Sequence, residues 1–406
     1  MVCAMKKFIM YGAGNIGRGF IGQLFSESGY QVGFIDVNPE LIDKLNRDRE
    51  YPVEIVGDES QEIIVKNVYG IDGNDLEKVA EEIATCDIMA TAVGVNALKH
   101  IARPIALGIE RRFNLGRGPL DIIICENLIG ADKYLKELIM QHIPHLKEKV
   151  EGNVGFVEAS IGRMVPIMTE EKRRGNPLRV CVEPYCILPV DKIAFKGKIP
   201  EVKNLYPFAP FNLFIQRKLF IHNMSHALCA YLGYLKGYIY IYEAAGDTEI
   251  RLVAYKALYE MAAVLSSENG ADIFPLMRHA DNLLFRFENK ALGDTIERVG
   301  RDTVRKLGPN DRLIGALKLC EKHGFSSNSL CIGIAAAMLF DADEASRALC
   351  SFVRENGVKQ ALSKYCGYSG QSAGLIERLY NMLKEGRQIG ALLKFCNQFS
   401  QKEMIV

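Results

Sequence analysis

The sequence predicts an α/β domain built on a doubly wound parallel sheet, followed by a mostly α-helical domain. Up to about residue 150, short apolar runs alternate with helix-compatible segments, a pattern typical of a parallel sheet covered on both faces. From about Asn212 onward, almost only helical periodicity remains. The 406 residues also exceed the size at which a single hydrophobic core stops growing. We therefore expect two domains, residues 1–200 and 201–406.

The strands of the sheet are expected in short apolar runs bounded by turn or helical segments. Four such runs are predicted as strands: 7–11, 32–37, 86–93 and 120–126. Between the first two, a helix is expected from about residue 16 to 28, because Gly29 supplies a C-terminal stop. The stretch 176–197 contains prolines and β-branched residues, which predicts added strands at the edge of the sheet.

Composition and charge exclude several classes of protein. The net charge of +1 argues against a nucleic-acid partner or attachment to a membrane surface. The longest uncharged apolar run, 330–340, is too short to span a bilayer, and no signal-peptide core follows the N-terminus. Eleven cysteines without a CxxC pair predict reduced, mostly buried thiols and no structural zinc site. We expect a cytoplasmic protein with no metal, and the sequence leaves open whether Met1 or Met5 starts the natural chain.

A glycine-rich turn follows the first predicted strand. Gly12, Gly14 and Gly17 form the pattern G-x-G-x-x-G, and Asn15 and Ile16 lie between the second and third glycines. The first glycine permits a tight turn, the second lets backbone N–H groups approach a pyrophosphate, and the third allows close helix–strand packing. The pattern therefore predicts a Rossmann-like, dinucleotide-binding turn.

Two further segments support a dinucleotide site. Asp36 ends the second strand, where a carboxylate accepts hydrogen bonds from a ribose 2′-OH and repels a 2′-phosphate, so NAD is favoured over NADP. Arg18 either reaches a phosphate or is a solvated helix side chain. Thr91, Val93 and Gly94 lie at the end of a later strand, where the cofactor crevice of a doubly wound sheet opens.

The segment 216–226 carries polar residues on an otherwise apolar helix. Because an α-helix turns about 100° per residue, Lys218, Asn223 and His226 fall within an arc of about 140°, and His222 lies on the same side. Each one alone is more often a solvated lysine, a capping asparagine or a structural histidine. Together on one face they either point into water or line a cavity, so the pattern alone leaves both interpretations open.

These motifs resemble the long-chain polyol-specific dehydrogenases, the mannitol dehydrogenase family. The resemblance covers nearly the whole chain, and its motifs, which include the spacing Lys-x4-Asn-x2-His on a helix, are highly specific when taken together. The other segments that carry it are GAGNIGRGFIG (12–22), TAVG (91–94), CENL (125–128), VGFVEASIGRMVP (154–166), VDKIAFKG (190–197), RKLFIHNMSHALCAYLG (217–233) and ERVGRDTVRKLGPNDRLIGAL (297–317).

The resemblance implies a role for each polar residue of the helix. Members of the family use no metal, so Lys218 matches the general base that takes the proton of the reacting hydroxyl. Asn223 and Asn127, the asparagine of CENL, match a pair that donates amide N–H groups to the developing alkoxide. His226 is expected to help hold the lysine amine, whereas His222 is outside the family's signature and is interpreted as structural.

A basic cluster bears on the choice of substrate, and its members are Arg298, Arg301, Arg305, Lys306 and Arg312. Taken alone, the cluster is interpreted as a solvated basic face whose positive charge is partly balanced by nearby acidic residues. The resemblance to sugar-phosphate members of the family implies instead that one or two of these residues bind a phosphate, for which guanidinium groups are suited. The implied reaction is the reversible, NAD-dependent oxidation of D-mannitol 1-phosphate to D-fructose 6-phosphate.

Several alternatives stay open. The substrate is otherwise an unphosphorylated polyol, as for mannitol 2-dehydrogenases, or a hexuronate such as fructuronate or tagaturonate. A family resembling 6-phosphogluconate dehydrogenase also joins a Rossmann domain to a helical one, but its lysine-to-asparagine spacing is shorter. A non-catalytic NAD-binding sensor is disfavoured because all the expected catalytic side chains are present. The expected partner is a small-molecule substrate, bound by a monomer or a homodimer.

Overall fold

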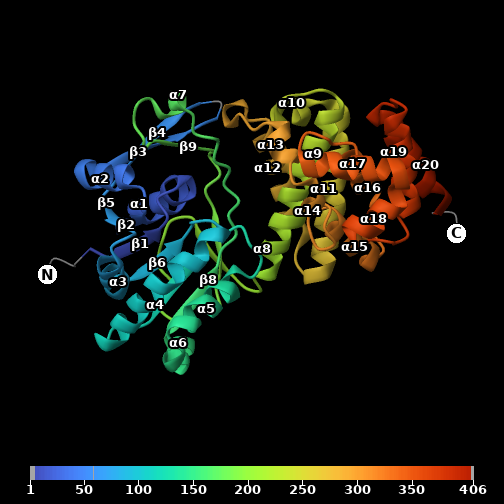
Figure 1. Cartoon of the computed structure of the whole chain (residues 1–406). Helices are drawn as coiled ribbons and strands as arrows, with labels where there is room; N and C mark the ends of the chain where they lie inside the picture. The colour runs from blue at the N-terminus through green and yellow to red at the C-terminus, as the bar shows by residue number, and fades with distance from the viewer. Residues whose placement is uncertain (1–4, 58, 404–406) are drawn as a thin grey trace. The chain divides into compact units, whose positions relative to one another are not determined.

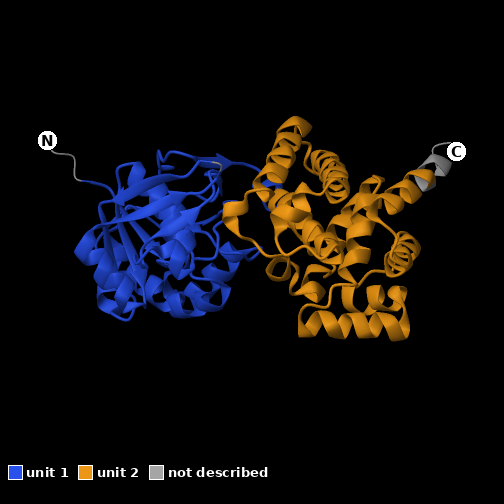
Figure 2. Cartoon of the chain, turned by 90° about the horizontal axis from the view of Figure 1, so that it is seen from above, with its two compact units in different colours: residues 1–215 blue, residues 216–406 orange. Residues whose placement is uncertain are grey.

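The computed structural model describes residues 5–57 and 59–403. Residues 1–4, on which the question of the natural start falls, lie outside the described residues. The chain forms two compact units, residues 1–215 and 216–406, which Figure 2 shows in separate colours. Each unit is described by itself below.

Unit 1 is built on a six-stranded parallel sheet, which confirms the predicted fold class (Figure 1). The strand order is β5-β2-β1-β6-β7-β8, the order of a Rossmann fold. All five pairings in this sheet are parallel. The strands are β1 (Lys7–Tyr11), β2 (Gln31–Asp36), β5 (Val68–Asp72), β6 (Ile88–Thr91), β7 (Leu120–Ile124) and β8 (Val154–Glu158).

Each face of the sheet packs against its own apolar cluster, because the strands are buried on both sides. On one face the cluster includes residues of the strands and of the helices α3 (Leu76–Thr85), α4 (Leu98–Asn114) and α5 (Ala131–His142). On the other face it includes the π-helical turn η1 (Gly17–Gly22) and α1 (Gln23–Glu27). The remaining helical segments of the unit are α2 (Pro39–Asp48), η2 (Val95–Ala97), η3 (Pro144–Leu146), α6 (Lys147–Asn153) and α7 (Glu170–Arg173).

The strands expected in 176–197 do not extend the edge of the main sheet. β9 (Val180–Val182) joins β3 (Glu50–Ile55) and β4 (Gln61–Lys66) in a separate sheet, and β10 (Leu188–Asp191) pairs with β11 (Leu205–Phe208). The close packing of β9 against η1 depends on Gly19. A Cβ at Gly19 would lie 2.7 Å from a methyl of Val180 and 2.8 Å from one of Val182. The bare backbone of η1 therefore packs directly against β9.

From α8 onward the chain is helical, as predicted. The long helix α11 illustrates how the local sequence sets the boundaries: the Asp247 side chain caps its first turn and Gly270, at φ +60°, ends it. The helical segments are α8 (Asn212–Gln216), η4 (Arg217–Asn223), α9 (Met224–Leu235), α10 (Ile241–Gly246), α11 (Thr248–Asn269), α12 (Ile273–Phe287), η5 (Lys290–Leu292), α13 (Ile296–Gly300), α14 (Thr303–Lys306), α15 (Ile314–His323), α16 (Asn328–Ala337), α17 (Glu344–Asn356), α18 (Val358–Cys366), α19 (Ala373–Lys384) and α20 (Ile389–Glu403).

The core of unit 2 is organised around α9. Nearly all of its residues are buried, and it packs against α10, α11, α13 and α16. Because α9 continues directly from η4, the residues of the predicted polar face are anchored at the start of a largely buried helix. This anchoring favours a fixed geometry for their side chains.

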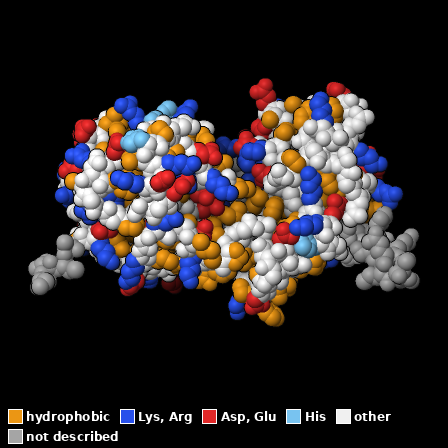
Figure 3. All heavy atoms as spheres, turned by 90° about the horizontal axis from the view of Figure 1, so that it is seen from below, with side chains coloured by type: hydrophobic (Ala, Val, Ile, Leu, Met, Phe, Trp, Pro, Cys, Tyr) orange, Lys and Arg blue, Asp and Glu red, His pale blue; other side chains and the backbone are white. Residues whose placement is uncertain are grey.

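The surface and the thiols agree with the composition. On the face shown in Figure 3, basic and acidic side chains are interspersed over both units. The ten cysteines within the described residues are free thiols, and only Cys186 among them is not buried. No helix in the described part of the chain is long and apolar enough to cross a membrane.

Candidate active site

The glycine-rich turn lies where the strand order reverses, between β1 and its neighbour β6. In doubly wound sheets this position opens a crevice at the carboxyl ends of the strands. Gly12 follows β1 with φ +103°, and a Cβ there would lie 2.5 Å from the carbonyl oxygen of Ala92. Only glycine therefore allows the turn to pass so close to the end of β6.

The other two glycines differ in what surrounds them. A Cβ on Gly17 would lie 2.0 Å from the carbonyl oxygen of Gly12, so the third glycine closes the turn against its own helix. Gly14 is exposed, and no protein atom lies within 4 Å of the position that its Cβ would take. A ligand can therefore approach the backbone of Gly14 from the side on which a Cβ would lie. This combination fits a pyrophosphate held against the turn.

Asp36 is held at the end of β2 by two backbone groups. Its Oδ2 accepts a hydrogen bond from the N–H of Ala13 at 2.8 Å, and its Oδ1 accepts one from Asn38 at 3.0 Å. The carboxylate is thus tied to the glycine-rich turn, half-buried at the edge of a cavity. A carboxylate in this place suits the ribose of a dinucleotide.

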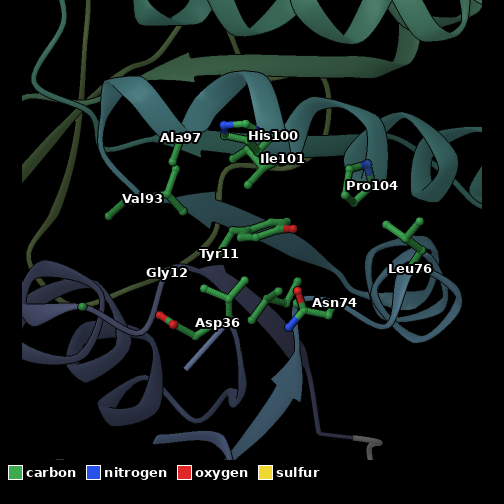
Figure 4. A pocket seen from close by; sticks show the side chains of 15 residues that line it. Tyr11, Gly12, Asp36, Asn74, Leu76, Val93, Ala97, His100, Ile101 and Pro104 are labelled. Atoms are coloured by element: carbon green, nitrogen blue, oxygen red, sulfur yellow. The ribbon is translucent and has the colours of Figure 1, made fainter. Parts of the chain in front are cut away.

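The cavity beside Asp36 has a volume of about 630 Å³ (Figure 4). Gly12, Gly14, Asp36 and Val93, four of the predicted cofactor residues, line it. Much of the remaining wall is apolar, and its members are Tyr11, Ile35, Val37, Leu76, Ala92, Ala97, Ile101 and Pro104, with Gly73, Asn74 and His100 completing it. An apolar cavity with a few placed polar groups is typical of a nucleotide-sized ligand.

Tyr11 lies in the middle of this cavity and was not singled out from the sequence. It is the last residue of β1, and its ring faces the cavity beneath Ile101 in Figure 4. Burial, followed by the charge of Asp36, raises the pKa of Tyr11 to about 12. Its position at the end of a strand next to the glycine-rich turn is the signal that identifies it in retrospect.

Of the stretch from Thr91 to Gly94, Ala92 and Val93 line the cavity, and Thr91 and Gly94 flank them in sequence. Glu126, which is buried, accepts hydrogen bonds from the backbone N–H groups of Val93 at 2.9 Å and Gly94 at 2.8 Å. Thr91 is fully buried, and its Oγ1 has no hydrogen-bond partner among the described residues. A buried polar atom of this kind at the end of β6 fits a site completed by a ligand.

The rest of the glycine-rich turn supports the fold. Asn15 and Ile16 are half-buried, and Ile16 packs against the apolar cluster beneath the turn. Arg18 is buried rather than solvated, and its Nη1 donates to the carbonyl oxygen of Ala13 at 2.5 Å. Burial lowers the pKa of Arg18 to about 10. The guanidinium of Arg18 therefore stabilises the glycine-rich turn by this hydrogen bond to its backbone.

Asn127 is exposed in the loop that follows β7. Two carboxylates flank this loop. Glu126 ties its start to Val93 and Gly94, and Glu158, at the end of β8, accepts a hydrogen bond from the N–H of Gly130 at 3.2 Å. Burial and the charge of Asp132 raise the pKa of Glu158 to about 7. The loop that carries Asn127 is therefore fastened at both ends.

In unit 2, the segment Arg217–Asn223 is a π-helix, whereas the sequence predicted an α-helix. Hydrogen bonds in a π-helix join residues five apart, so Lys218 and Asn223 lie one turn apart on the same side. Lys218, Asn223 and His226 are all half-buried, while Phe220 and Met224 between them are buried. π-Helical turns are rare and occur frequently at functional sites. Among the described residues a second one, η1, directly follows the glycine-rich turn.

His226 is held between an aromatic ring and a carboxylate. Its ring stacks on Phe287 at 4.8 Å and 14°, and its Nε2 lies 3.2 Å from Oδ2 of Asp294. The ring N–H is not aimed straight at that oxygen, so the contact is a close polar approach rather than a linear hydrogen bond. His222 is buried against the edge of Phe287. Burial and the charge of Arg286 hold the pKa of His222 well below its usual value.

The five basic residues predicted to bind phosphate occupy different surroundings. Arg298 donates from Nε to Oδ1 of Asp294 at 2.6 Å, and 39% of its side chain remains exposed. Arg301 is exposed. Arg305 is also exposed, and it forms an ion pair with Asp311 at 3.3 Å. Arg298 is thus the one whose carboxylate partner also contacts the predicted catalytic helix.

Lys306 and Arg312 differ from the others in being largely enclosed. Lys306 is buried, and its Nζ donates to the carbonyl oxygens of Val299 and Arg301. Burial, with the charges of Arg312 and Arg305, lowers the pKa of Lys306 to about 7. Arg312 donates from Nε to Oδ1 of its neighbour Asp311 at 2.8 Å. The cluster therefore does not form one continuous basic face.

Besides Tyr11, two further residues near the site, Asp294 and Glu126, had no role predicted from the sequence. Asp294 lies four residues before Arg298, a spacing that brings opposite charges together across one turn, but its contact with His226 depends on the tertiary fold. Within the described residues, no three His, Cys, Asp or Glu side chains are grouped so that they could hold a metal ion.

Comparison with known proteins identifies the family. Residues 6–204 match the mannitol dehydrogenase Rossmann domain, and residues 211–366 match the mannitol dehydrogenase C-terminal domain. The mannitol-1-phosphate 5-dehydrogenase of Brevibacillus brevis is 38% identical over 365 residues, covering 88% of this chain and 93% of that protein. That of Geobacillus thermodenitrificans is 39% identical over 364 residues, covering 88% and 94%.

A solved structure supports the fold. The ternary complex of Pseudomonas fluorescens mannitol 2-dehydrogenase with NAD and D-mannitol is similar, with a TM-score of 0.73 and 17% identity, over 97% of this chain and 94% of that one. At this identity the likeness concerns the fold alone. The resemblance predicted from the sequence is confirmed, and this chain belongs to the mannitol dehydrogenase family.

Proposed function

We propose that this chain is an NAD-dependent dehydrogenase that interconverts D-mannitol 1-phosphate and D-fructose 6-phosphate. The name shared by relatives at 38% and 39% identity supports this substrate. The structural observation that supports a phosphorylated substrate is the carboxylate of Asp294, which contacts both His226 and Arg298. A partly exposed guanidinium next to the histidine of the proposed catalytic helix favours a substrate with an anionic group.

In this proposal the cofactor occupies the crevice of unit 1. The backbone of Gly14 faces the pyrophosphate, and Asp36 accepts hydrogen bonds from the adenosine ribose, where it would repel a 2′-phosphate. Asn15, Ile16, Thr91, Val93 and Gly94 complete the contacts, with Gly12 and Gly17 shaping the turn. When bound, NAD supplies the hydride acceptor for oxidation and, in its reduced form, the hydride donor for the reverse reaction.

The chemistry at the substrate falls to side chains in this proposal. Lys218, as the neutral amine, takes the proton of the reacting hydroxyl. Asn223 and Asn127 donate amide N–H groups to the oxygen on which negative charge develops. His226 helps hold the lysine amine in place. Such a set of groups polarises and deprotonates an alcohol without a metal.

Phosphate recognition is proposed for the exposed guanidinium groups. Arg298 is partly exposed and Arg301 is exposed, so both can meet an anion, whereas Lys306 uses two of its three donors on backbone carbonyls. Arg305 and Arg312 are proposed to add positive charge. A cytoplasmic location and a monomer or homodimer remain part of the same proposal.

The experiment that tests the function is NADH oxidation at neutral pH, with and without EDTA. Fructose 6-phosphate, fructose, fructuronate and tagaturonate are compared at equal concentration, and NADPH replaces NADH in a parallel series. We expect a strong preference for fructose 6-phosphate and NADH, unchanged by EDTA. Preference for a free ketose or a uronate would overturn the phosphate assignment while keeping the family mechanism.

Two other outcomes would change the proposal further. Loss of activity in EDTA would contradict metal independence. Tight NADH binding without turnover of any of the four substrates would point to a non-catalytic NAD-binding protein. The structure favours catalysis over that alternative because Lys218 and Asn223 lie on the same side of a π-helical turn.

A further inference from the structure

Asp294 carries two contacts on one carboxylate. Its Oδ2 lies 3.2 Å from Nε2 of His226, and its Oδ1 accepts a hydrogen bond from Nε of Arg298 at 2.6 Å. Nη2 of Arg298 also donates to Oδ1. Only 12% of the Asp294 side chain is exposed. A proposed catalytic residue and a proposed phosphate ligand therefore share one partner.

The backbone around Asp294 is fixed as firmly as its side chain. Its own carbonyl oxygen accepts a hydrogen bond from the N–H of Ile241 at 2.9 Å. The next residue, Thr295, forms an antiparallel bridge with Tyr240 and caps α13 by accepting the N–H of Arg298 at 3.3 Å. The carboxylate is thus held in place from both directions of the chain.

The His226 ring is held by its contacts with Asp294 and Phe287. The ring is stacked on Phe287, which leaves rotation in the ring plane as its main freedom. A carboxylate can only accept, so Nε2 of His226 must carry a proton where it faces Asp294. The Nδ1 atom is then the one directed away from this pair. A histidine whose one nitrogen is engaged by a carboxylate has its orientation and its tautomer set by that partner.

The charges around Asp294 keep it ionised. Burial alone would raise the pKa of Asp294, but the contacts and charges of His226 and Arg298 outweigh it and hold that pKa below its usual value. Arg298 donates hydrogen bonds from both Nε and Nη2 to the carboxylate of Asp294. Its Nη1 has no partner within the part of the chain that the structure describes, so it can meet an external anion.

We infer that Asp294 is a positioning residue shared by the two tasks of the proposed site: one oxygen orients His226 for the chemistry, and the other orients Arg298 for the substrate phosphate. This inference rests on the proposed function. Its consequence is that a single carboxylate sets the relation between the reacting centre and the anionic end of the substrate. A purely structural ion pair would have no such double effect.

The test is Asp294→Asn, which keeps the size of the side chain and removes the charge, made in three backgrounds. These are the otherwise unchanged enzyme, His226→Gln and Arg298→Met. Values of kcat and KM for fructose 6-phosphate are measured in each, together with NADH binding. Asp247→Asn is the matched control, because Asp247 is a similarly enclosed carboxylate that pairs with Lys236 and contacts neither His226 nor Arg298.

Alone, Asp294→Asn should lower kcat and raise KM for fructose 6-phosphate, each by about 3-fold or more, while NADH binding stays unchanged. In the Arg298→Met background the effect on KM should vanish and the effect on kcat should remain. In the His226→Gln background the effect on kcat should vanish and the effect on KM should remain. Contacting residues show non-multiplicative effects of about 2- to 150-fold, which makes these differences measurable.

The inference is overturned if Asp294→Asn lowers kcat/KM by the same factor in all three backgrounds, or if Asp247→Asn reproduces its pattern. If Asp294→Asn fails to fold, Asp294→Glu replaces it, because this variant keeps the charge but displaces the carboxylate from both partners.

Failure of the proposed function would look different. In that case the unchanged enzyme would prefer a substrate without phosphate, and the test would be repeated with that substrate. The kcat effect through His226 must then persist, and its absence would overturn the role of Asp294 independently of substrate identity.

Discussion

The carboxylate of Glu126 accepts a hydrogen bond from the backbone N–H of Gly94 at 2.8 Å, and a second one from Val93 at 2.9 Å. One buried side chain thus joins the loop after β7 to the loop after β6. Asn127, proposed to donate to the substrate oxygen, is the next residue. The wall of the cofactor crevice and the position of Asn127 therefore depend on the same carboxylate.

Glu126→Gln should weaken NADH binding and lower kcat by about tenfold each, because a hydrogen bond to a charged acceptor contributes about 1.5–3 kcal/mol. The glutamine amide keeps one acceptor but turns an N–H₂ group toward a backbone N–H. The chain contains no tryptophan, so the fluorescence of NADH itself reports binding. Glu137→Gln, at an exposed position on α5, is the control. Unchanged NADH affinity in Glu126→Gln would show that the loops hold without this carboxylate.

The glycine-rich turn predicts opposite outcomes for two alanine substitutions. Gly17→Ala should lower the melting temperature and abolish NADH binding, because its Cβ would lie 2.0 Å from the carbonyl oxygen of Gly12. Gly14→Ala should melt within about 2 °C of the unchanged protein, since small surface changes rarely exceed about 0.5 kcal/mol. It should nevertheless bind NADH at least about tenfold more weakly, because the methyl group occupies the side proposed for the pyrophosphate.

Thermal melting measures the stability of the Gly17→Ala and Gly14→Ala variants, and NADH titration measures their affinity for the cofactor. Gly118→Ala is the control. A Cβ at Gly118 also meets no atom within 4 Å, but this residue lies away from the crevice, in the loop before β7. If Gly14→Ala bound NADH normally, the pyrophosphate would have to lie elsewhere in unit 1.

Features that depend on short stretches of sequence could be predicted. The apolar run ending at Tyr11 and the carboxylate of Asp36 were expected as a strand and a site residue, and the structure places both around one cavity. The helical part from Asn212 onward was recognisable from its period alone. These features are local, because a strand, a tight turn and a helix each have a characteristic pattern over fewer than about twenty residues.

Features that depend on distant pairings could not be predicted. β9 pairs with β3, which is far away in sequence, because Gly19 lets β9 pack on η1. The π-helical geometry at Lys218 has no periodic signature that distinguishes it from an α-helix. Asp294 meets His226 only through the packing of α9 against α13. The residue types of the site were therefore visible in the sequence, but the partners that hold them were not.

Lys218→Ala should reduce turnover by about 10²- to 10⁴-fold, the usual contribution of a general base, while NADH binding is nearly unchanged. Steady-state kinetics and NADH titration measure the two effects separately. Lys384→Ala, at an exposed position on α19, is the control for loss of a lysine. If Lys218→Ala kept the full rate, the base would have to be sought elsewhere. Lys306 would be the next candidate, because burial lowers its pKa to about 7.

Glu260 offers a test of the core of unit 2 that does not involve the proposed site. It lies on α11, and its buried Oε2 has no hydrogen-bond partner among the described residues. Burial raises the pKa of Glu260 to about 8, and the charge of Lys256 and a hydrogen bond from Ser329 only partly oppose this. In the unfolded chain the same carboxyl ionises near pH 4.3.

Because the unfolded state loses this proton first, the free energy of unfolding should fall as pH rises from about 4.5 to 8. Glu260→Gln has no such proton to lose, so between pH 5 and pH 8 its free energy of unfolding should rise relative to that of the unchanged protein by on the order of 3 kcal/mol. Urea unfolding at both pH values measures this difference. Glu355→Gln, at an exposed position on α17, should show no change. Equal pH dependence of the Glu260→Gln variant and the unchanged protein would mean that Glu260 is ionised in the folded state, with a counter-charge or water reaching Oε2.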